Sequence, residues 1–184
     1  MRRGARRNDW SVSDVAYLVE NAGKIPKREI CKKLKRSGKS VERKAAWLRK
    51  QGVAIDLRSY RASLAPCPAC GRMSGLLGSD GICEPCRRRD QLAGIHARIA
   101  ELMPLLPQED RDVYERTEAE TESRYDPLPK APRTDGLSFY AKARAEESHS
   151  LAVERTVARN LRREIKAAQK RKERIEKKVK SMGV

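Results

Sequence analysis

Apolar residues recur at helical spacing through most of this chain, and short breaks containing glycine or proline separate the periodic stretches. The first stretch predicts a helix over residues 12–21. Before it, Ser11 and Asp14 have the spacing of a capping box, with Asp in place of the preferred Glu, and Gly23 follows it. The residues expected to face inward are Val15, Leu18 and Val19.

Two further short helices are predicted before residue 52. Pro26 suits the first turn of the second helix, in which Ile30 and Leu34 are four positions apart. Ser37 is placed to cap a third helix over residues 38–50, whose inward positions are Val41, Ala45 and Leu48. Three such helices, with a turn of three to four residues between the second and the third, form a helix-turn-helix domain.

The later part of the chain also has helical periodicity. One helix is expected to run from the second pair of cysteines to just before Pro104, and a Glu-rich stretch over residues 108–124 predicts an exposed helix. Residues 125–136 contain three prolines within six positions, which is typical of an extended linker.

A last long helix is predicted over residues 138–181. Its apolar seam has the alternating three and four residue spacing of a coiled coil, and Glu154 and Lys172 interrupt it. Three arrangements stay open: a homodimeric coiled coil through residues 137–184, a helix packed on a partner, or a solvated helix. The seam consists of Leu151, Ala158, Leu161, Ile165, Ala168, Ile175 and Val179.

Four of the five cysteines form two Cys-x-x-Cys pairs separated by twelve residues, and these are Cys67, Cys70, Cys83 and Cys86. Four thiolates at this spacing are typical of one structural Zn²⁺ with tetrahedral coordination. Disulfides or redox dithiols are disfavoured, because no secretory signal opens the sequence and no βαβ context surrounds the pairs. Gly71 and Gly81 stand where the backbone would turn tightly around the metal.

The predicted fold class is mainly α, with a short β-hairpin at residues 73–81 inside the cysteine module. Aromatic residues make up 4% of the chain and charged residues 36%, which favours small modules over one large core. No apolar run is long enough to span a membrane. The expected segments are residues 1–9, 10–60, 61–104, 105–136 and 137–184.

The formal net charge is +17, and it is unevenly distributed. Residues 1–66 carry 18 basic and 6 acidic side chains, and residues 137–184 carry 14 and 6, whereas residues 106–136 carry 5 and 9. Basic ends of this kind are typical of proteins that bind nucleic acid, and double-stranded DNA is the expected partner. Solubility or an anionic membrane surface is the alternative that the charge alone leaves open.

A stretch of about 45 residues that begins at Trp10 resembles the Myb/SANT-like helix-turn-helix domains of phage and bacterial regulators, including the GcrA type. The resemblance rests on Trp10, Ser11, Asp14, Leu18, Glu29, Ile30, Leu34, Lys35, Arg36, Ser37, Ser40, Val41, Lys44 and Leu48. It covers about a quarter of the chain. Two positions depart from the pattern: Lys35, where such domains often carry Gly, and Cys31, where Ala is common. The cysteine module that follows is similar to a treble clef or zinc ribbon.

The resemblance implies that residues 38–50 form a recognition helix for the major groove. Its expected base contacts are Lys39, Glu42, Arg43 and Ala46, because Arg can bind guanine O6 and N7 and Glu can accept from cytosine N4. Phosphate contacts are expected from Arg6, Arg7, Lys27, Lys32, Lys33, Lys35, Arg36, Lys44 and Lys50.

These features favour a non-enzymatic, zinc-stabilised transcriptional regulator of phage type that is located in the cytoplasm with the nucleoid. An antiterminator or a recombination accessory protein, with RNA polymerase or a recombinase as partner, has the same architecture. An HNH-like nuclease is disfavoured because neither of the two histidines, His96 and His149, stands beside the cysteines. RNA binding ranks below DNA binding, since RRM, KH and dsRBD signatures are missing.

Overall fold

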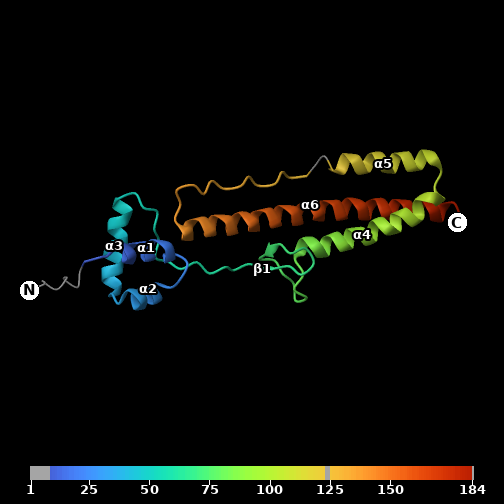
Figure 1. Ribbon diagram of the computed structural model, residues 1–184. Helices are drawn as coiled ribbons and strands as arrows, with labels where there is room; N and C mark the ends of the chain where they lie inside the picture. Colours follow the sequence, from blue (N-terminus) through green and yellow to red (C-terminus); the bar gives the residue numbers. More distant parts are fainter. Residues whose placement is uncertain (1–8, 123–124, 184) are drawn as a thin grey trace, which may run out of the picture. The chain divides into compact units, whose positions relative to one another are not determined.

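The computed structural model describes residues 9–122 and 125–183, and the expected phosphate contacts Arg6 and Arg7 lie outside them. The chain is mainly α-helical and has one two-stranded antiparallel sheet (Figure 1). It divides into two compact units. The first comprises Met1–Ala62 and Ala131–Ser148, and the second comprises Ser63–Lys130 and His149–Val184. No helix among the described residues is long and apolar enough to cross a membrane.

The first unit contains helices α1 (Val12–Asn21), α2 (Lys27–Leu34) and α3 (Gly38–Lys50). The two predicted caps are present: Ser11 Oγ accepts from the Asp14 N–H across 3.0 Å, and Ser37 Oγ accepts from the Ser40 N–H across 3.3 Å. The core of the unit is formed by Leu18, Ala22, Ile30, Val41, Ala45, Leu48 and Ile55. Val19, predicted to face inward, is 41% exposed, because the core side of α1 is centred on Leu18.

The beginning of the long helix α6 (Phe139–Ser181) also belongs to the first unit. The ring of Tyr140 lies 4.5 Å from the guanidinium carbon of Arg58. Gly23 has φ +85°, and a Cβ there would come within 3.3 Å of Phe139. The sequence placed residues 137–148 only in a tail, because nothing local in these residues shows that they pack on the helices of residues 12–50.

The second unit contains the cysteine module, and its sheet pairs β1 (Ala65–Pro66) with β2 (Met73–Ser74). The strands therefore flank the first cysteine pair, whereas the sequence placed the hairpin between the two pairs. That stretch retains a single antiparallel bridge between Leu77 and Cys83. Because its turn over residues 78–81 is closed by a Gly81 N–H to Gly78 O bond, few residues are left for a ladder.

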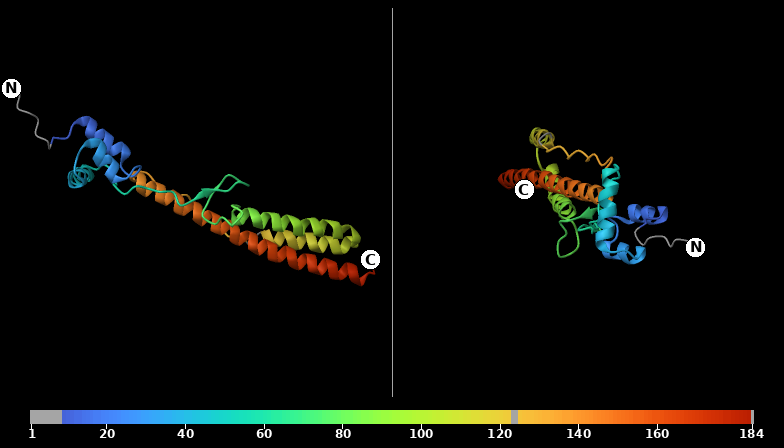
Figure 2. Two further views of the ribbon diagram at one scale, coloured as in Figure 1. Left: turned by 90° about the horizontal axis from the view of Figure 1, so that it is seen from below. Right: turned by 90° about the vertical axis from the view of Figure 1, so that its left-hand side faces the viewer.

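Helix α4 (Glu84–Leu102) starts at the second cysteine pair and is followed by a 3₁₀ turn, η1 (Met103–Leu105), and by α5 (Gln108–Glu122). Helices α4 and α6 lie side by side and run in the same direction (Figures 1 and 2). Two clusters of buried residues join them. The first cluster contains Leu92, Ile165 and Ala168, and the second contains Leu102, Leu106, Ile175 and Val179.

The apolar seam of α6 is therefore covered by helices of the same chain. Ala158, Ile165, Ala168, Ile175 and Val179 are each at most 9% exposed. The sequence left open a coiled coil of two copies, packing on a partner molecule and a solvated helix, and it did not predict that α4 of the same chain would cover the seam. Pairing of two copies through residues 137–184 stays a prediction.

Candidate functional site

The four paired cysteines come together in the second unit, as their spacing predicted. Their sulfur atoms lie within 4.8 Å of one another, and none of these cysteines is in a disulfide. Cys70 Sγ lies 3.8 Å from Cys83 Sγ. A tetrahedral Zn²⁺ with Zn–S bonds of about 2.3 Å separates its sulfur ligands by about 3.8 Å, whereas a disulfide needs about 2.05 Å. The group can therefore hold one metal ion.

Local backbone geometry positions the first pair. The Cys67 N–H donates to Arg72 O across 2.9 Å, and the Gly71 N–H donates to Cys67 O across 2.7 Å. Gly71 and Gly81 have φ of +71° and +75°, a region that glycine enters without a steric penalty. The prediction that the backbone turns tightly at both glycines, beside the cysteine pairs, is thus confirmed.

The second pair begins α4. Cys83 is the N-cap of this helix, and Cys86 lies in its first turn after Pro85. The Cys83 N–H donates to Cys67 Sγ across 3.3 Å. Hydrogen bonds to a ligand sulfur from the backbone stabilise its thiolate form, as does the positive end of a helix for the thiols beside it.

The thiols differ in their acidity before any metal binds. The hydrogen bond from the Cys83 N–H, with further bonds from the backbone of Cys70 and Ala69, lowers the pKa of Cys67 to about 6. Burial raises the pKa of Cys83 to about 12, and it also raises the pKa of Cys86. Cys67 thus offers a thiolate at neutral pH, and the buried thiols would lose their protons to an incoming cation.

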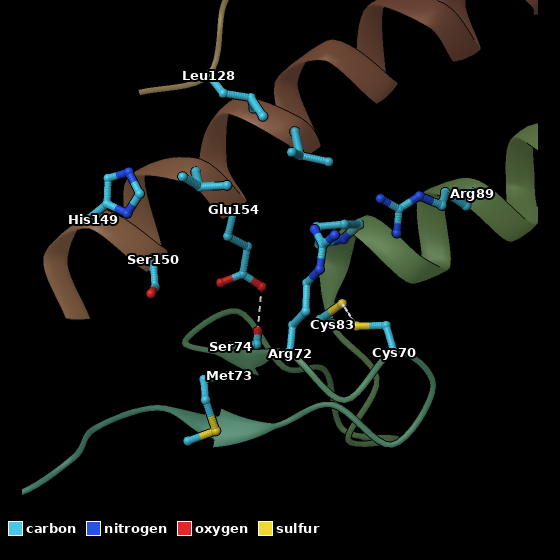
Figure 3. A pocket seen from close by; sticks show the side chains of 13 residues that line it. Cys70, Arg72, Met73, Ser74, Cys83, Arg89, Leu128, His149, Ser150 and Glu154 are labelled. Carbon is cyan, nitrogen blue, oxygen red and sulfur yellow. Dashed lines mark hydrogen bonds between the residues drawn. The ribbon is translucent and has the colours of Figure 1, made fainter. Parts of the chain in front are cut away.

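A cavity of about 470 Å³ lies beside the cysteine group (Figure 3). Cys70 and Cys83 form one part of its wall, and the side chains of Arg72, Arg89 and Glu154 also line it. Figure 3 shows Glu154 pointing from α6 toward Ser74, whose hydroxyl donates to the carboxylate. A second hydrogen bond runs from the Gly75 N–H to Glu154 Oε2 across 3.1 Å. Glu154 therefore fixes the loop after the first cysteine pair to the long helix.

The first unit presents the residues expected to contact bases on one side of α3. Lys39, Glu42, Arg43 and Ala46 are all exposed, whereas Val41, Ala45 and Leu48 are buried. Glu42 forms an ion pair with Lys27 of α2, and this hydrogen bond holds the pKa of Glu42 below its ordinary value. Trp47 on the same helix is 50% exposed, and Lys44 Nζ lies 4.0 Å from its ring centroid. Trp47 was not among the residues that the sequence predicted for this surface.

The expected phosphate contacts do not all have free side chains. Lys32, Lys33, Lys35 and Lys50 are exposed. Arg36 is held inside the unit, since its guanidinium lies 4.5 Å from the ring centroid of Trp10 and donates to Asp14 Oδ2 across 3.0 Å. Its side chain is 13% exposed. The structure thus gives Arg36 a packing role that its sequence context did not reveal.

Comparison with family models, with curated proteins and with solved structures finds no match for this chain.

Proposed function

We propose that this chain is a zinc-stabilised, sequence-specific DNA-binding protein that acts as a transcriptional regulator of phage type and catalyses no reaction. The observation that carries the proposal is the exposed side of α3. Lys39, Glu42, Arg43 and Ala46 recur there at helical spacing, opposite the positions that face the core. An α-helix of this length fits the major groove of B-DNA, where base edges are accessible.

The connection between α2 and α3 supports a helix-turn-helix. Only residues 35–37 separate the two helices. Lys35 has φ 50° and ψ 41°, which is the left-handed conformation that ends α2 and turns the chain toward α3. Such a turn lets the second helix enter the groove while the first lies across the sugar-phosphate backbone.

Two residues on α3 are the proposed readers of sequence. Arg43 is exposed and forms no ion pair with a described carboxylate, so its guanidinium can bind guanine O6 and N7 in a bidentate manner. Glu42 stays ionised beside Lys27 and can accept from cytosine N4. Because this ion pair is exposed, it is weak, and a phosphate can replace Glu42 as the partner of Lys27.

The cysteine group has a structural role in this proposal, with one Zn²⁺ bound by Cys67, Cys70, Cys83 and Cys86. Four protein ligands fill a tetrahedral shell and leave no position for a water or a substrate. The metal would supply folding free energy to a small module with little apolar core of its own.

The experiment compares two variants of the full chain on a set of DNA duplexes. Arg43→Ala should relax the preference among sequences, since a bidentate base contact is worth about 1–3 kcal/mol of discrimination. Lys33→Ala should weaken binding to every duplex alike, because a phosphate contact carries no sequence information. Equal losses on every sequence for both variants would refute the assignment of α3 as the recognition helix.

A further inference from the structure

The long helix α6 carries a row of cations on the side away from its core. Lys166, Lys170, Arg174, Lys177 and Lys180 are all exposed, and none of them forms an ion pair with a described side chain. At about 100° per residue, these five positions fall within an arc of roughly 120°. We call them the α6 stripe.

The buried positions of the same helix lie on the other side. Ile165, Ala168, Ile175 and Val179 pack against α4 and the segment after it. At 100° per residue, the centre of the arc that these four buried positions span is about 160° around the helix axis from the centre of the α6 stripe. Since the core fixes the rotation of the helix, the stripe faces outward as a rigid row, about 21 Å long at 1.5 Å per residue.

Acidic side chains elsewhere on α6 are few and are mostly occupied. Glu176 lies outside the arc and has Arg98 3.8 Å away. Glu173 lies within the arc and accepts from Gln169 across 2.9 Å, which leaves the row with a net charge of +4. A structural helix gains nothing from like charges at successive turns, because pairs four residues apart repel each other. The arrangement therefore fits an anionic ligand.

The part of α6 that precedes the stripe shows how this face holds an anion. Asp126 places one carboxylate oxygen 2.7 Å from Arg163 Nη1 and the other 3.6 Å from Arg159 Nε. The backbone of Asp126 is held there by Asn160, which donates to its carbonyl oxygen across 2.9 Å. Arg159 and Arg163 lie on the same side of α6 as the stripe, so a carboxylate of the chain itself pairs with the two cations that precede the row.

The geometry points to a second nucleic-acid surface: the α6 stripe binds the phosphate backbone of duplex DNA without reading its sequence. This inference rests on the proposed function, and it assigns the non-specific part of the affinity to the second unit. A straight row of cations matches the regular phosphates of a duplex. Single strands are bound on aromatic platforms, and α6 has no aromatic residue from 155 to 181. A membrane surface would need the apolar face of α6, which α4 covers.

The test uses the full, zinc-loaded chain and two triple variants that remove the same charge. The stripe variant is Lys166→Gln, Lys170→Gln and Lys177→Gln. The control variant is Arg116→Gln, Lys130→Gln and Arg133→Gln, which changes three exposed cations outside the stripe that form no ion pair with a described side chain. Glutamine is a good helix former, so circular dichroism should show the same helix content in both variants.

Fluorescence anisotropy with a 30-base-pair duplex of random sequence, over a range of NaCl concentrations, measures the outcome. The stripe variant should lower the magnitude of the slope of log K against log[NaCl] by about 2–3, since each neutralised phosphate contributes about 0.9. The control variant should change the slope by less than about 1. Equal slopes for the two variants would overturn the inference, because only the net charge would then matter.

Two further results separate this inference from the proposed function. If the stripe variant keeps the slope of the unchanged chain while Arg43→Ala still relaxes sequence preference, phosphate binding by the α6 stripe is refuted and base recognition by α3 is supported. If the stripe variant shows the reduced slope of log K against log[NaCl] and Arg43→Ala changes no sequence preference, phosphate binding by the α6 stripe is supported and base recognition by α3 is refuted. A loss of slope with duplex RNA and not with duplex DNA would overturn the assignment of DNA as the ligand.

Discussion

Gly75 donates its backbone N–H to the carboxylate of Glu154 across 3.1 Å, and this bond joins the loop after the first cysteine pair to the long helix. Ser74, which is 3% exposed, donates its hydroxyl to the same carboxylate. The approach is close, because a Cβ on Gly75 would lie 2.5 Å from Leu151. The acidic residue that interrupts the apolar seam of α6 therefore provides one of the contacts between this helix and the cysteine module, together with the ion pair from Arg162 to Glu84.

Replacing Glu154 with Ala should lower the free energy of unfolding of the second unit by about 1–3 kcal/mol, because the buried Ser74 hydroxyl and the Gly75 N–H then lose their acceptor. Urea denaturation followed by circular dichroism measures this change. Glu173→Ala on the exposed side of α6 is the matched control and should change the free energy by at most about 0.5 kcal/mol. Equal effects would show that Glu154 contributes only as a surface charge.

Lys35 has a left-handed backbone conformation, which costs a residue with a Cβ about 1–2 kcal/mol. Lys35→Gly should therefore stabilise the first unit by about 0.5–1 kcal/mol, after the greater freedom of glycine in the unfolded chain is subtracted. Lys32→Gly, inside α2, should destabilise it by about 1 kcal/mol. Thermal denaturation of the two variants should show melting temperatures that move in opposite directions. A fall for both would contradict the conformation of the turn.

Arg36 should act through packing and Lys33 through phosphate contact, although both lie in the same basic stretch. Arg36→Gln removes the cation–π contact with Trp10, worth about 0.5–1 kcal/mol, together with the ion pair to Asp14. It should lower the melting temperature without changing the salt dependence of DNA binding.

Lys33→Gln should do the reverse and reduce the slope of log K against log[salt] by about 1. Anisotropy titrations and thermal melts of the two variants measure both quantities. If Arg36→Gln reduced this slope and left the melting temperature unchanged, Arg36 would contact phosphate, and the packing role would be contradicted.

The pairs of cysteines should bind one metal ion per chain, and Cys31 should not take part. Cys31 is partly buried against the core of the first unit, whereas Cys70 lies in the group of four cysteines. Cys70→Ser should weaken binding of Zn²⁺ by more than the roughly 10–100-fold that the loss of an outer-shell partner costs. Cys31→Ser should leave the affinity unchanged.

Competition with a chromophoric chelator measures both affinities, and the spectrum of the Co²⁺ form reports the number of thiolate ligands. The second unit should also lose thermal stability when a chelator removes the metal, because binding free energy is folding free energy. Full stability of the chelated protein would contradict a structural metal.

Local patterns predicted much of this fold because local forces decide it. The capping bonds at Ser11 and Ser37 are short-range and can be recognised from residue spacing, and so can the cysteine pairs. The contacts that the sequence did not reveal join distant residues, as between Glu154 and Gly75 or between Gly23 and Phe139. A seam of apolar residues also has the same spacing whether a second copy or α4 covers it.

The candidate site shows the same division. Spacing alone identified the four cysteines that could hold a metal ion, because a single ion requires its ligands at close and regular spacing. Spacing could not distinguish Arg36 from Lys33, since only the folded unit places Trp10 beside one of them. The outward position of the α6 stripe likewise depends on which side of the helix α4 covers.

Selection of duplexes from a random pool by the full, zinc-loaded chain tests the central claim most directly. We expect one short motif to be enriched over repeated rounds, and we expect Arg43→Ala to lose preference at one base pair of that motif while Lys33→Ala selects the same motif more weakly. Recovery of unenriched random sequence by the unchanged chain, at a salt concentration where it still binds DNA, would contradict sequence-specific recognition by α3.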